Sequence, residues 1–195
     1  MLRARTAVAL GVVTCLAFAQ QACGTAGSTD AGTPATPPSA APASSASPEP
    51  DPLLTGKNQV VIAPVGSFES VLAVDDKGRL NTTDGDSEFS LFVLVPATSG
   101  THQIQTAKPS TDGQPACMGI KENGTQPLTV VAAPCDAERD GQLFTIGVAD
   151  EAYTINSAGA YLRVSPELGL IAEEIGDGPA ATTFTLVDNG PAPGE

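Results

Sequence analysis

The sequence predicts an all-β domain built from three copies of a four-stranded unit. Short runs of alternating apolar and polar residues fill residues 53–188, Gly, Pro, Asn and Asp separate the runs, and the runs recur three times in the same order. Alternation with a period of two residues is typical of half-buried strands. The turn residues between the runs leave little room for helices. Residues 165–175 are the one stretch with some helical character, and Gly169 in its middle argues against a helix.

Each copy is expected to hold an initial apolar strand, a short apolar-x-apolar strand, a third strand and a closing Phe-x-aliphatic strand. In chain order the members are Val60 and Ile62, 72–74, Leu80 and 92–94; then Ile104, 118–120, Leu128 and Val130, and 144–146; then Tyr153 and Ile155, 162–164, Leu170 and 184–186. The initial strands begin near Ile62, Ile104 and Ile155, at steps of 42 and 51 residues. Propellers also repeat four-stranded units, but they need at least about four blades. A β-sandwich is the main rival.

The second copy carries the motifs of a known family. Cys-Met-Gly-Ile at 117–120, Cys-Asp at 135–136 and Gln-Leu-Phe at 142–144 follow the order Cys-Leu-Asp-Val, second cysteine and Gln-x-Trp of ricin-type repeats. The chain therefore resembles a ricin-type β-trefoil, a lectin-like module of three pseudo-symmetric four-stranded repeats. The resemblance extends over about 135 residues, and it is closest in the second copy.

This resemblance implies structural roles for the cysteines and aromatic residues. Cys117 and Cys135 are expected to form a disulfide, which closes a loop worth about 3 kcal/mol of stability and suits a location outside the cytoplasm. Phe92, Phe144 and Phe184 are expected to pack in the core of a chain that has no Trp.

The resemblance also locates the sugar pockets of the family, where a carboxylate at the Asp of Leu-Asp-Val accepts hydrogen bonds from sugar hydroxyls. Carried over by position, that Asp falls on Ala73, Gly119 and Arg163. None of these side chains can accept such a hydrogen bond. We therefore expect the standard sugar pockets to be lost.

Any remaining sugar binding is expected in the second copy. The glutamine of Gln-x-Trp is kept at Gln142, whereas Ser90 and Thr182 stand at the equivalent positions. Gln142 is expected beside the turn at Asn123 and the acidic pair Asp136 and Asp140. The predicted ligand-binding residues are Asn123, Asp136, Asp140 and Gln142.

The first 22 residues are typical of an export signal. Arg3 and Arg5 precede an apolar run from Ala7 to Ala19, and small residues follow. This run of 13 residues is shorter than the roughly 20 that a permanent transmembrane helix needs. We therefore expect the mature protein outside the cytoplasm.

Two processing routes are open for this signal. Residues 17–19 suit an ordinary signal peptidase and would give a secreted protein that starts at Gln20, while residues 22–24 resemble the lipobox of bacterial lipoproteins with Gln20 in place of the usual Leu. Cys15 leaves with the signal, so Cys23 remains as an unpaired exported thiol. We predict that Cys23 carries a lipid that anchors the protein to the cell membrane.

The ends of the mature chain are expected to be disordered. From residue 24 to residue 52 there is no Leu, Ile, Val or aromatic residue, so this Pro/Ala/Ser-rich stretch cannot bury enough surface to fold. The predicted organisation is a signal peptide at 1–22, a lipidated N-terminus and linker at 23–52, a trefoil domain at 53–188 and a disordered tail at 189–195.

Charge and residue chemistry restrict the function. Acidic residues outnumber basic ones 22 to 9, and such a surface repels nucleic acid and anionic lipid headgroups. His102 is the only histidine and has no second nitrogen or sulfur ligand nearby. The acidic residues Glu173, Glu174 and Asp177 are interpreted as a solvated strand edge. With no phosphate loop or nucleophile motif, we expect no catalysis, no cofactor, no bound metal and a monomer.

Three functions remain open from the sequence. The chain is interpreted first as a non-catalytic binding module of the cell envelope, for a protein or glycan ligand, with a carbohydrate-binding lectin-like protein as its variant. A structural envelope protein is the second reading. The third is an inhibitor of secreted hydrolases that would use the loop 106–116, in which Lys108 precedes Pro109.

Overall fold

The computed structural model describes residues 51–194 except 68, 123 and 125–126. The predicted signal, Cys23 and the linker up to residue 50 lie outside the described residues, as does Asn123.

The described part of the chain is all-β, as the alternating runs predicted. It contains twelve strands and three short 3-10 turns, and no α-helix. The 3-10 turns are η1 (Pro52–Leu54), η2 (Thr98–Gly100) and η3 (Asp140–Gln142). The strands are β1 (Asn58–Pro64), β2 (Val71–Val74), β3 (Leu80–Thr83), β4 (Leu91–Pro96), β5 (His102–Thr106), β6 (Ala116–Lys121), β7 (Leu128–Pro134), β8 (Thr145–Ala149), β9 (Ala152–Ser157), β10 (Ala160–Ser165), β11 (Gly169–Glu174) and β12 (Phe184–Pro191).

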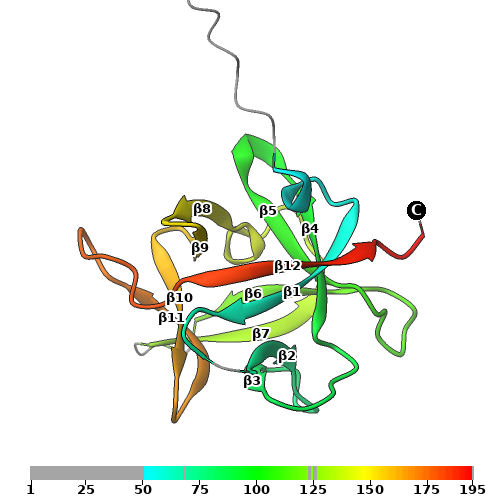
Figure 1. Cartoon of the computed structure of the whole chain (residues 1–195), viewed down its shortest axis with the longest axis horizontal. Helices are drawn as coiled ribbons and strands as arrows, with labels where there is room; N and C mark the ends of the chain where they lie inside the picture. Colours follow the sequence, from blue (N-terminus) through cyan, green and yellow to red (C-terminus); the bar gives the residue numbers. More distant parts are fainter. Residues whose placement is uncertain (1–50, 68, 123, 125–126, 195) are drawn as a thin grey trace, which may run out of the picture. The chain divides into compact units, whose positions relative to one another are not determined.

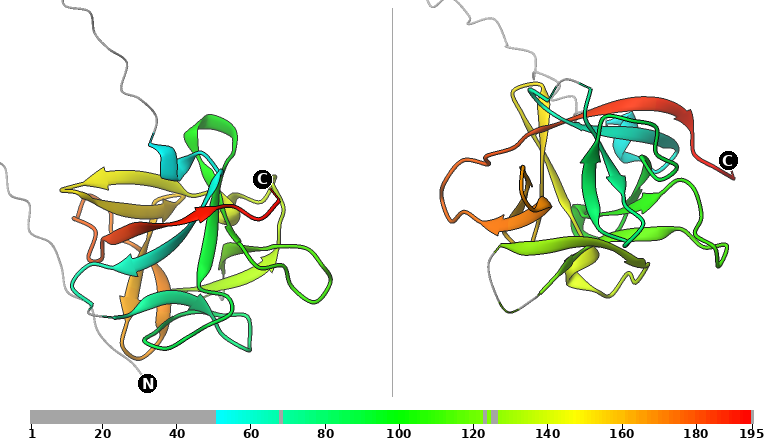
Figure 2. Two further views of the ribbon diagram at one scale, coloured as in Figure 1. Left: turned by 45° about the vertical axis from the view of Figure 1, so that its right-hand side comes forward. Right: turned by 90° about the horizontal axis from the view of Figure 1, so that it is seen from below.

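Nine of these strands close into an antiparallel barrel (Figure 1). Around the barrel their order is β10, β11, β7, β6, β5, β4, β1, β12 and β9, and the pairing of β9 with β10 closes the ring. Strand β8 pairs with β9 as an extra strand, and β2 and β3 form a separate two-stranded hairpin. Figure 2 shows the barrel from two further sides.

The prediction of a β-trefoil with three equivalent four-stranded repeats is wrong. The three copies of the sequence pattern contribute two, three and four strands to the closed ring, so they are not equivalent in hydrogen bonding. Several ring pairings also join different copies, such as β4 with β5 and β7 with β11. Alternation of side chains locates strands, but it does not choose their partners, and the threefold order of the runs therefore did not carry over to the sheet.

The barrel interior holds the predicted aromatic core. Phe92, Phe144 and Phe184 are at most 1% exposed and belong to one apolar cluster with the inward residues of β1, β5 and β9. Burying each such ring contributes about 1.5–3 kcal/mol relative to exposure. The prediction that the three phenylalanines are core residues is confirmed.

Both ends of the domain extend beyond the predicted limits of 53 and 188. Asp51 caps η1 by accepting a hydrogen bond from the Leu53 N–H at 2.9 Å, and its other carboxylate oxygen accepts one from the Tyr153 hydroxyl at 2.5 Å. Strand β12 continues to Pro191, where the prediction placed a frayed tail. Beyond it the Ala192 N–H donates to the Lys57 carbonyl at 2.8 Å.

Candidate ligand-binding site

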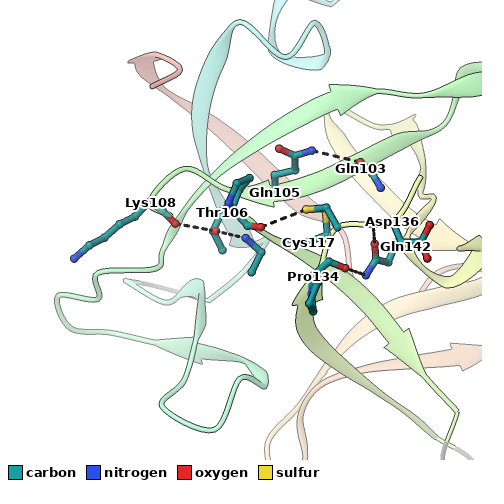
Figure 3. Close-up of a disulfide and its surroundings, with 11 residues drawn as sticks. Gln103, Gln105, Thr106, Lys108, Cys117, Pro134, Asp136 and Gln142 are labelled. Carbon is teal, nitrogen blue, oxygen red and sulfur yellow. Dashed lines mark hydrogen bonds between the residues drawn. A yellow bond between two sulfur atoms is a disulfide. The ribbon is translucent and has the colours of Figure 1, made fainter. Parts of the chain in front are cut away.

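A disulfide joins the start of β6 to the segment that follows β7. Cys117 and Cys135 are bonded across 4.8 Å between their Cα atoms, which confirms the predicted pair (Figure 3). Cys117 is fully buried, whereas Cys135 is exposed. The bridge therefore fixes a surface segment to the barrel wall.

Gln142 fixes the same segment from beneath. Its Oε1 accepts a hydrogen bond from the Asp136 N–H at 2.8 Å, and its Nε2 donates to the Pro134 carbonyl at 3.0 Å (Figure 3). A Cβ at Gly119 would lie 3.1 Å from the Gln142 Cγ, so a side chain at this position would crowd the side chain of Gln142. Gly119 thus makes room for Gln142, and Gln142 and the disulfide together form a clamp on residues 134–136.

Of the predicted ligand residues in the second copy, Gln142 and Asp136 belong to this clamp, and Asp140 begins the same 3-10 turn as Gln142. Gln142 is 0% exposed and both of its amide atoms bond to the backbone. One carboxylate oxygen of Asp136 accepts from the Glu138 N–H at 3.0 Å, and the other lies 3.6 Å from Arg139. Asp140 is exposed, and its backbone carbonyl accepts from the Ser157 hydroxyl at 2.9 Å. These residues are neighbours, but Gln142 presents no polar atom to solvent.

The three positions that match the family's carboxylate carry no acceptor for a sugar hydroxyl. Ala73 is 5% exposed, and Gly119 is covered by Gln142. Arg163 forms an ion pair with Glu173 at 2.8 Å on neighbouring strands β10 and β11. A sugar bound near these positions would therefore have to form its hydrogen bonds with other residues.

A hollow that the sequence did not reveal lies beside the clamp. It has a volume of about 600 Å³, which is within the usual range for small-molecule sites. We call it the hairpin hollow, because the turn of the β2–β3 hairpin forms one wall and the loop 107–115 another. Its lining residues are Val74, Asp75, Asp76, Gly78, Phe89, Thr106, Ser110, Thr111, Asp112, Gln114, Pro115, Ala116, Ala132, Ala133, Pro134 and Cys135.

Phe89 supplies the aromatic surface of the hairpin hollow. The Lys108 ammonium lies 5.6 Å from the centroid of the Phe89 ring and 2.9 Å from the Glu88 carboxylate, and neither charged residue lines the hollow. A cation over an aromatic ring at this distance is attracted by the negative face of the ring. Lys108 therefore contacts the Phe89 ring without lining the hollow.

The loop 107–115 is held at its base by Thr106. The Thr106 hydroxyl donates to the Lys108 carbonyl at 2.9 Å and accepts from the Ala116 N–H at 3.0 Å. At the tip, the Gly113 N–H donates to the Ser110 carbonyl at 3.0 Å, which closes a tight turn. This turn holds Ser110, Thr111 and Asp112 on the wall of the hollow.

Three carboxylates line the hairpin hollow, and they differ in how many hydrogen bonds they already make within the protein. Asp75 accepts hydrogen bonds from the N–H groups of Lys77 and Arg79 and pairs with the Arg79 guanidinium at 3.3 Å. Desolvation tends to raise its pKa, but the backbone and side-chain hydrogen bonds outweigh it and hold the pKa of Asp75 below its ordinary value. Asp76 and Asp112 are exposed at the rim. The Asp112 Oδ1 already accepts a hydrogen bond from the Gln114 N–H at 3.0 Å. The Asp76 carboxylate and the second oxygen of Asp112 are therefore available to accept hydrogen bonds from a ligand.

A second hollow adjoins the first. It has a volume of about 390 Å³, and we call it the terminal hollow because residues near both ends of the domain line it. Thr106 and Pro115 belong to both hollows. The remaining lining residues are Gly56, Val93, Val95, Gln105, Ala107, Pro109, Gly113, Ala192, Pro193 and Gly194.

His102 begins β5 and is half-buried. Its Nε2 lies 3.1 Å from the Leu54 carbonyl, so the ring holds the N-terminal turn η1 against the barrel. Burial lowers the pKa of His102, although the hydrogen bond to Leu54 opposes this shift.

The described residues contain no group of three or more His, Cys, Asp or Glu side chains placed to hold a metal ion. Within the same residues, no helix has the length and apolar character to span a membrane.

Comparison with known proteins finds likeness in fold alone. No protein-family model and no curated protein matches the chain. A solved structure described as the PSL1a-E64 complex matches with a TM-score of 0.53 at 12% identity, over 68% of this chain and 47% of that one. The Polyporus squamosus lectin bound to a Neu5Ac-Gal-GlcNAc epitope matches with a TM-score of 0.52 at 15% identity, over 68% of this chain and 49% of that one.

This chain covers almost the whole length of another, shorter solved structure. SeviL bound to the asialo-GM1 saccharide matches with a TM-score of 0.50 at 13% identity, over 68% of this chain and 98% of that one. The chain spans about half the length of the first two structures. The neighbours of this domain therefore include carbohydrate-binding lectins, with sequence identity too low to carry over any site residue.

Proposed function

We propose that the chain is a non-catalytic binding module of the cell envelope whose ligand is a saccharide that occupies the hairpin hollow. The observation that carries the proposal is the meeting of Phe89, the exposed carboxylates of Asp76 and Asp112, and the hydroxyls of Ser110 and Thr111 in one hollow of about 600 Å³. The likeness in fold to carbohydrate-binding lectins supports the same reading.

The chemistry of the hollow suits a sugar. The negative face of an aromatic ring attracts the partly positive C–H groups on the apolar side of a pyranose ring. Carboxylates accept hydrogen bonds from hydroxyls, and charged acceptors give stronger bonds than neutral ones. The same carboxylates repel anionic sugars, so the proposed ligand is a neutral or basic saccharide.

The site differs from the sugar pockets of the family that the sequence resembles. Those pockets would need an acceptor at Ala73, Gly119 or Arg163, which these residues do not provide. The hairpin hollow instead takes its acceptors from the β2–β3 turn and from the loop 107–115.

The binding test uses the mature full-length chain made soluble by Cys23→Ser. A glycan array should show retention on neutral or amino sugars and none on sialylated or uronic glycans. Phe89→Ala and Asp76→Asn should each weaken binding at least about tenfold, the size of one lost apolar or polar contact. Asp86→Asn is the matched control, because this substitution removes the same charge from a residue that lines a separate groove. Unchanged binding by both hollow variants, or no binding to any glycan, would contradict the proposal.

We further propose that lipid on Cys23 holds this module at the outer side of the cell membrane, with the Pro/Ala/Ser-rich linker as a spacer. The wild-type protein should then partition with membranes, and Cys23→Ser should release it or block its processing. A mature N-terminus at Gln20 would instead identify a secreted protein.

A further inference from the structure

The terminal hollow combines apolar walls with a single carboxamide. Val93, Ala107 and Ala192 are each 8% exposed and pack together in a small cluster with Val95 beside them. Among the described residues, Gln105 is the only one with a side-chain amide on the wall of the terminal hollow, and none with a charged side chain lines it. This hollow is therefore unlike the hairpin hollow, which carries three carboxylates.

The Gln105 amide is only partly used by the fold. Its Nε2 donates a long hydrogen bond of 3.4 Å to the Gln103 Oε1 on the same strand. Within the described part of the chain, no donor reaches the Gln105 Oε1. Gln105 is half-buried, so its carbonyl oxygen is an acceptor held beside an apolar wall.

The two hollows adjoin each other at two shared lining residues. Thr106 and Pro115 line both of them, and the base of the loop 107–115 lies at their junction. A ligand with its ring in the hairpin hollow could extend a substituent or a second residue into the terminal hollow. The loop is held by the Thr106 hydrogen bonds, so this junction is fixed before binding.

We infer that the terminal hollow accepts the acetamido group of an N-acetylated sugar, and this inference rests on the proposed function of the hairpin hollow. The amide N–H of the acetamido group donates to the Gln105 Oε1, and the methyl group packs on the apolar wall formed with Val95 and Ala192. An unacetylated amine would place a charge among apolar residues, which is costly without a partner. A hydroxyl would leave the apolar wall uncovered.

The direct test compares three disaccharide probes of one linkage on the soluble full-length chain. N,N′-diacetylchitobiose, chitobiose and cellobiose carry acetamido, amine and hydroxyl groups at the same ring position. The acetylated probe should bind at least about tenfold more tightly than cellobiose, since a site built for one polar group discriminates strongly against its absence. Titration should also shift the side-chain amide resonance of Gln105.

Two variants separate this inference from the proposed function. Gln105→Met keeps the length of the side chain and removes the carboxamide, so it should abolish the preference for the acetylated probe and leave cellobiose affinity unchanged. Gln59→Met is the matched control, because Gln59 lies on β1, donates to the Asn189 carbonyl and lines neither hollow. Equal affinity for acetylated and unacetylated probes, with Gln105→Met silent, would overturn the acetamido site and leave the hairpin hollow standing. Absence of binding by all three probes to the wild-type chain would overturn both.

Discussion

The β6–β7 pair and the β2–β3 hairpin occupy equivalent places in two copies of the same sequence pattern, yet the structure uses them differently. Strands β6 and β7 are long members of the closed ring, and the disulfide and Gln142 clamp their far end. Strands β2 and β3 have four residues each and stand outside the ring. The hairpin hollow opens between the two pairs.

The difference separates stability from binding in this domain. The residues that look most characteristic in the sequence, Cys117, Cys135 and Gln142, hold the clamped side together. The residues with chemistry to offer a ligand, Phe89, Asp76 and the loop 107–115, belong to turns and connections around the short hairpin. Stability should therefore respond to changes in the clamp, and binding to changes around the hairpin.

Breaking the disulfide should have the largest effect on stability. The bridge closes a loop with a sequence separation of 18 residues, and in the chain-entropy model its loss costs about 3 kcal/mol. Reduction, or replacement of both cysteines by Ala, should lower the free energy of unfolding by that amount in urea titrations while the far-ultraviolet spectrum stays that of a β protein. A reductant should have no further effect on the double variant. An unchanged midpoint after reduction would show that the clamp does not depend on the bridge.

Removal of the Gln142 side chain should have the next largest effect on stability. Gln142→Ala deletes two part-buried hydrogen bonds, to the Asp136 N–H and the Pro134 carbonyl, and leaves both backbone groups without this partner, at a cost of about 2 kcal/mol. Ser90→Ala, at the equivalent place in the first copy, is the control, because its hydroxyl donates one partly exposed hydrogen bond to the Ser87 carbonyl. This control should cost less than about 1 kcal/mol. Equal costs for the two variants in chemical denaturation would remove the distinction between the two copies.

Much of the fold could be predicted from the sequence, because strand positions follow from local alternation. The three buried phenylalanines and the disulfide were also predicted, as structural roles that the resemblance to ricin-type repeats implied. The partners of each strand depend on long-range packing, so the expected equivalence of the three copies did not hold in the ring.

The candidate site was far less predictable. Gln142 was predicted to face a ligand, but the absence of a side chain at Gly119 lets it lie beneath the surface and bond to the backbone. Phe89, Asp76 and Asp112 come from separate turns, and only the folded chain brings them around one hollow. No spacing along the sequence indicated that they would meet.

Removal of the N-terminal contact of His102 should have a smaller effect that depends on pH. Because burial lowers the pKa of His102 in the folded state, the unfolded chain binds its proton more readily. The neutral ring therefore contributes stability above the ordinary pKa of 6.5, and this contribution is lost as the pH falls through the folded pKa. His102→Gln should flatten this part of the stability curve between about pH 7 and pH 5. A curve of unchanged slope would show that His102 does not titrate with folding.

The most direct test of the central claim is a titration of the soluble full-length chain with neutral saccharides, including cellobiose and N,N′-diacetylchitobiose, followed by backbone amide shifts. Saccharide binding in the hairpin hollow should produce saturable shifts around Phe89, Asp76 and the loop 107–115, with Asp140 and Gln142, which do not line the hollow, largely unmoved. Phe89→Ala should lose these shifts at unchanged stability. Shifts centred on Asp136, Asp140 and Gln142 with the hairpin silent would contradict it.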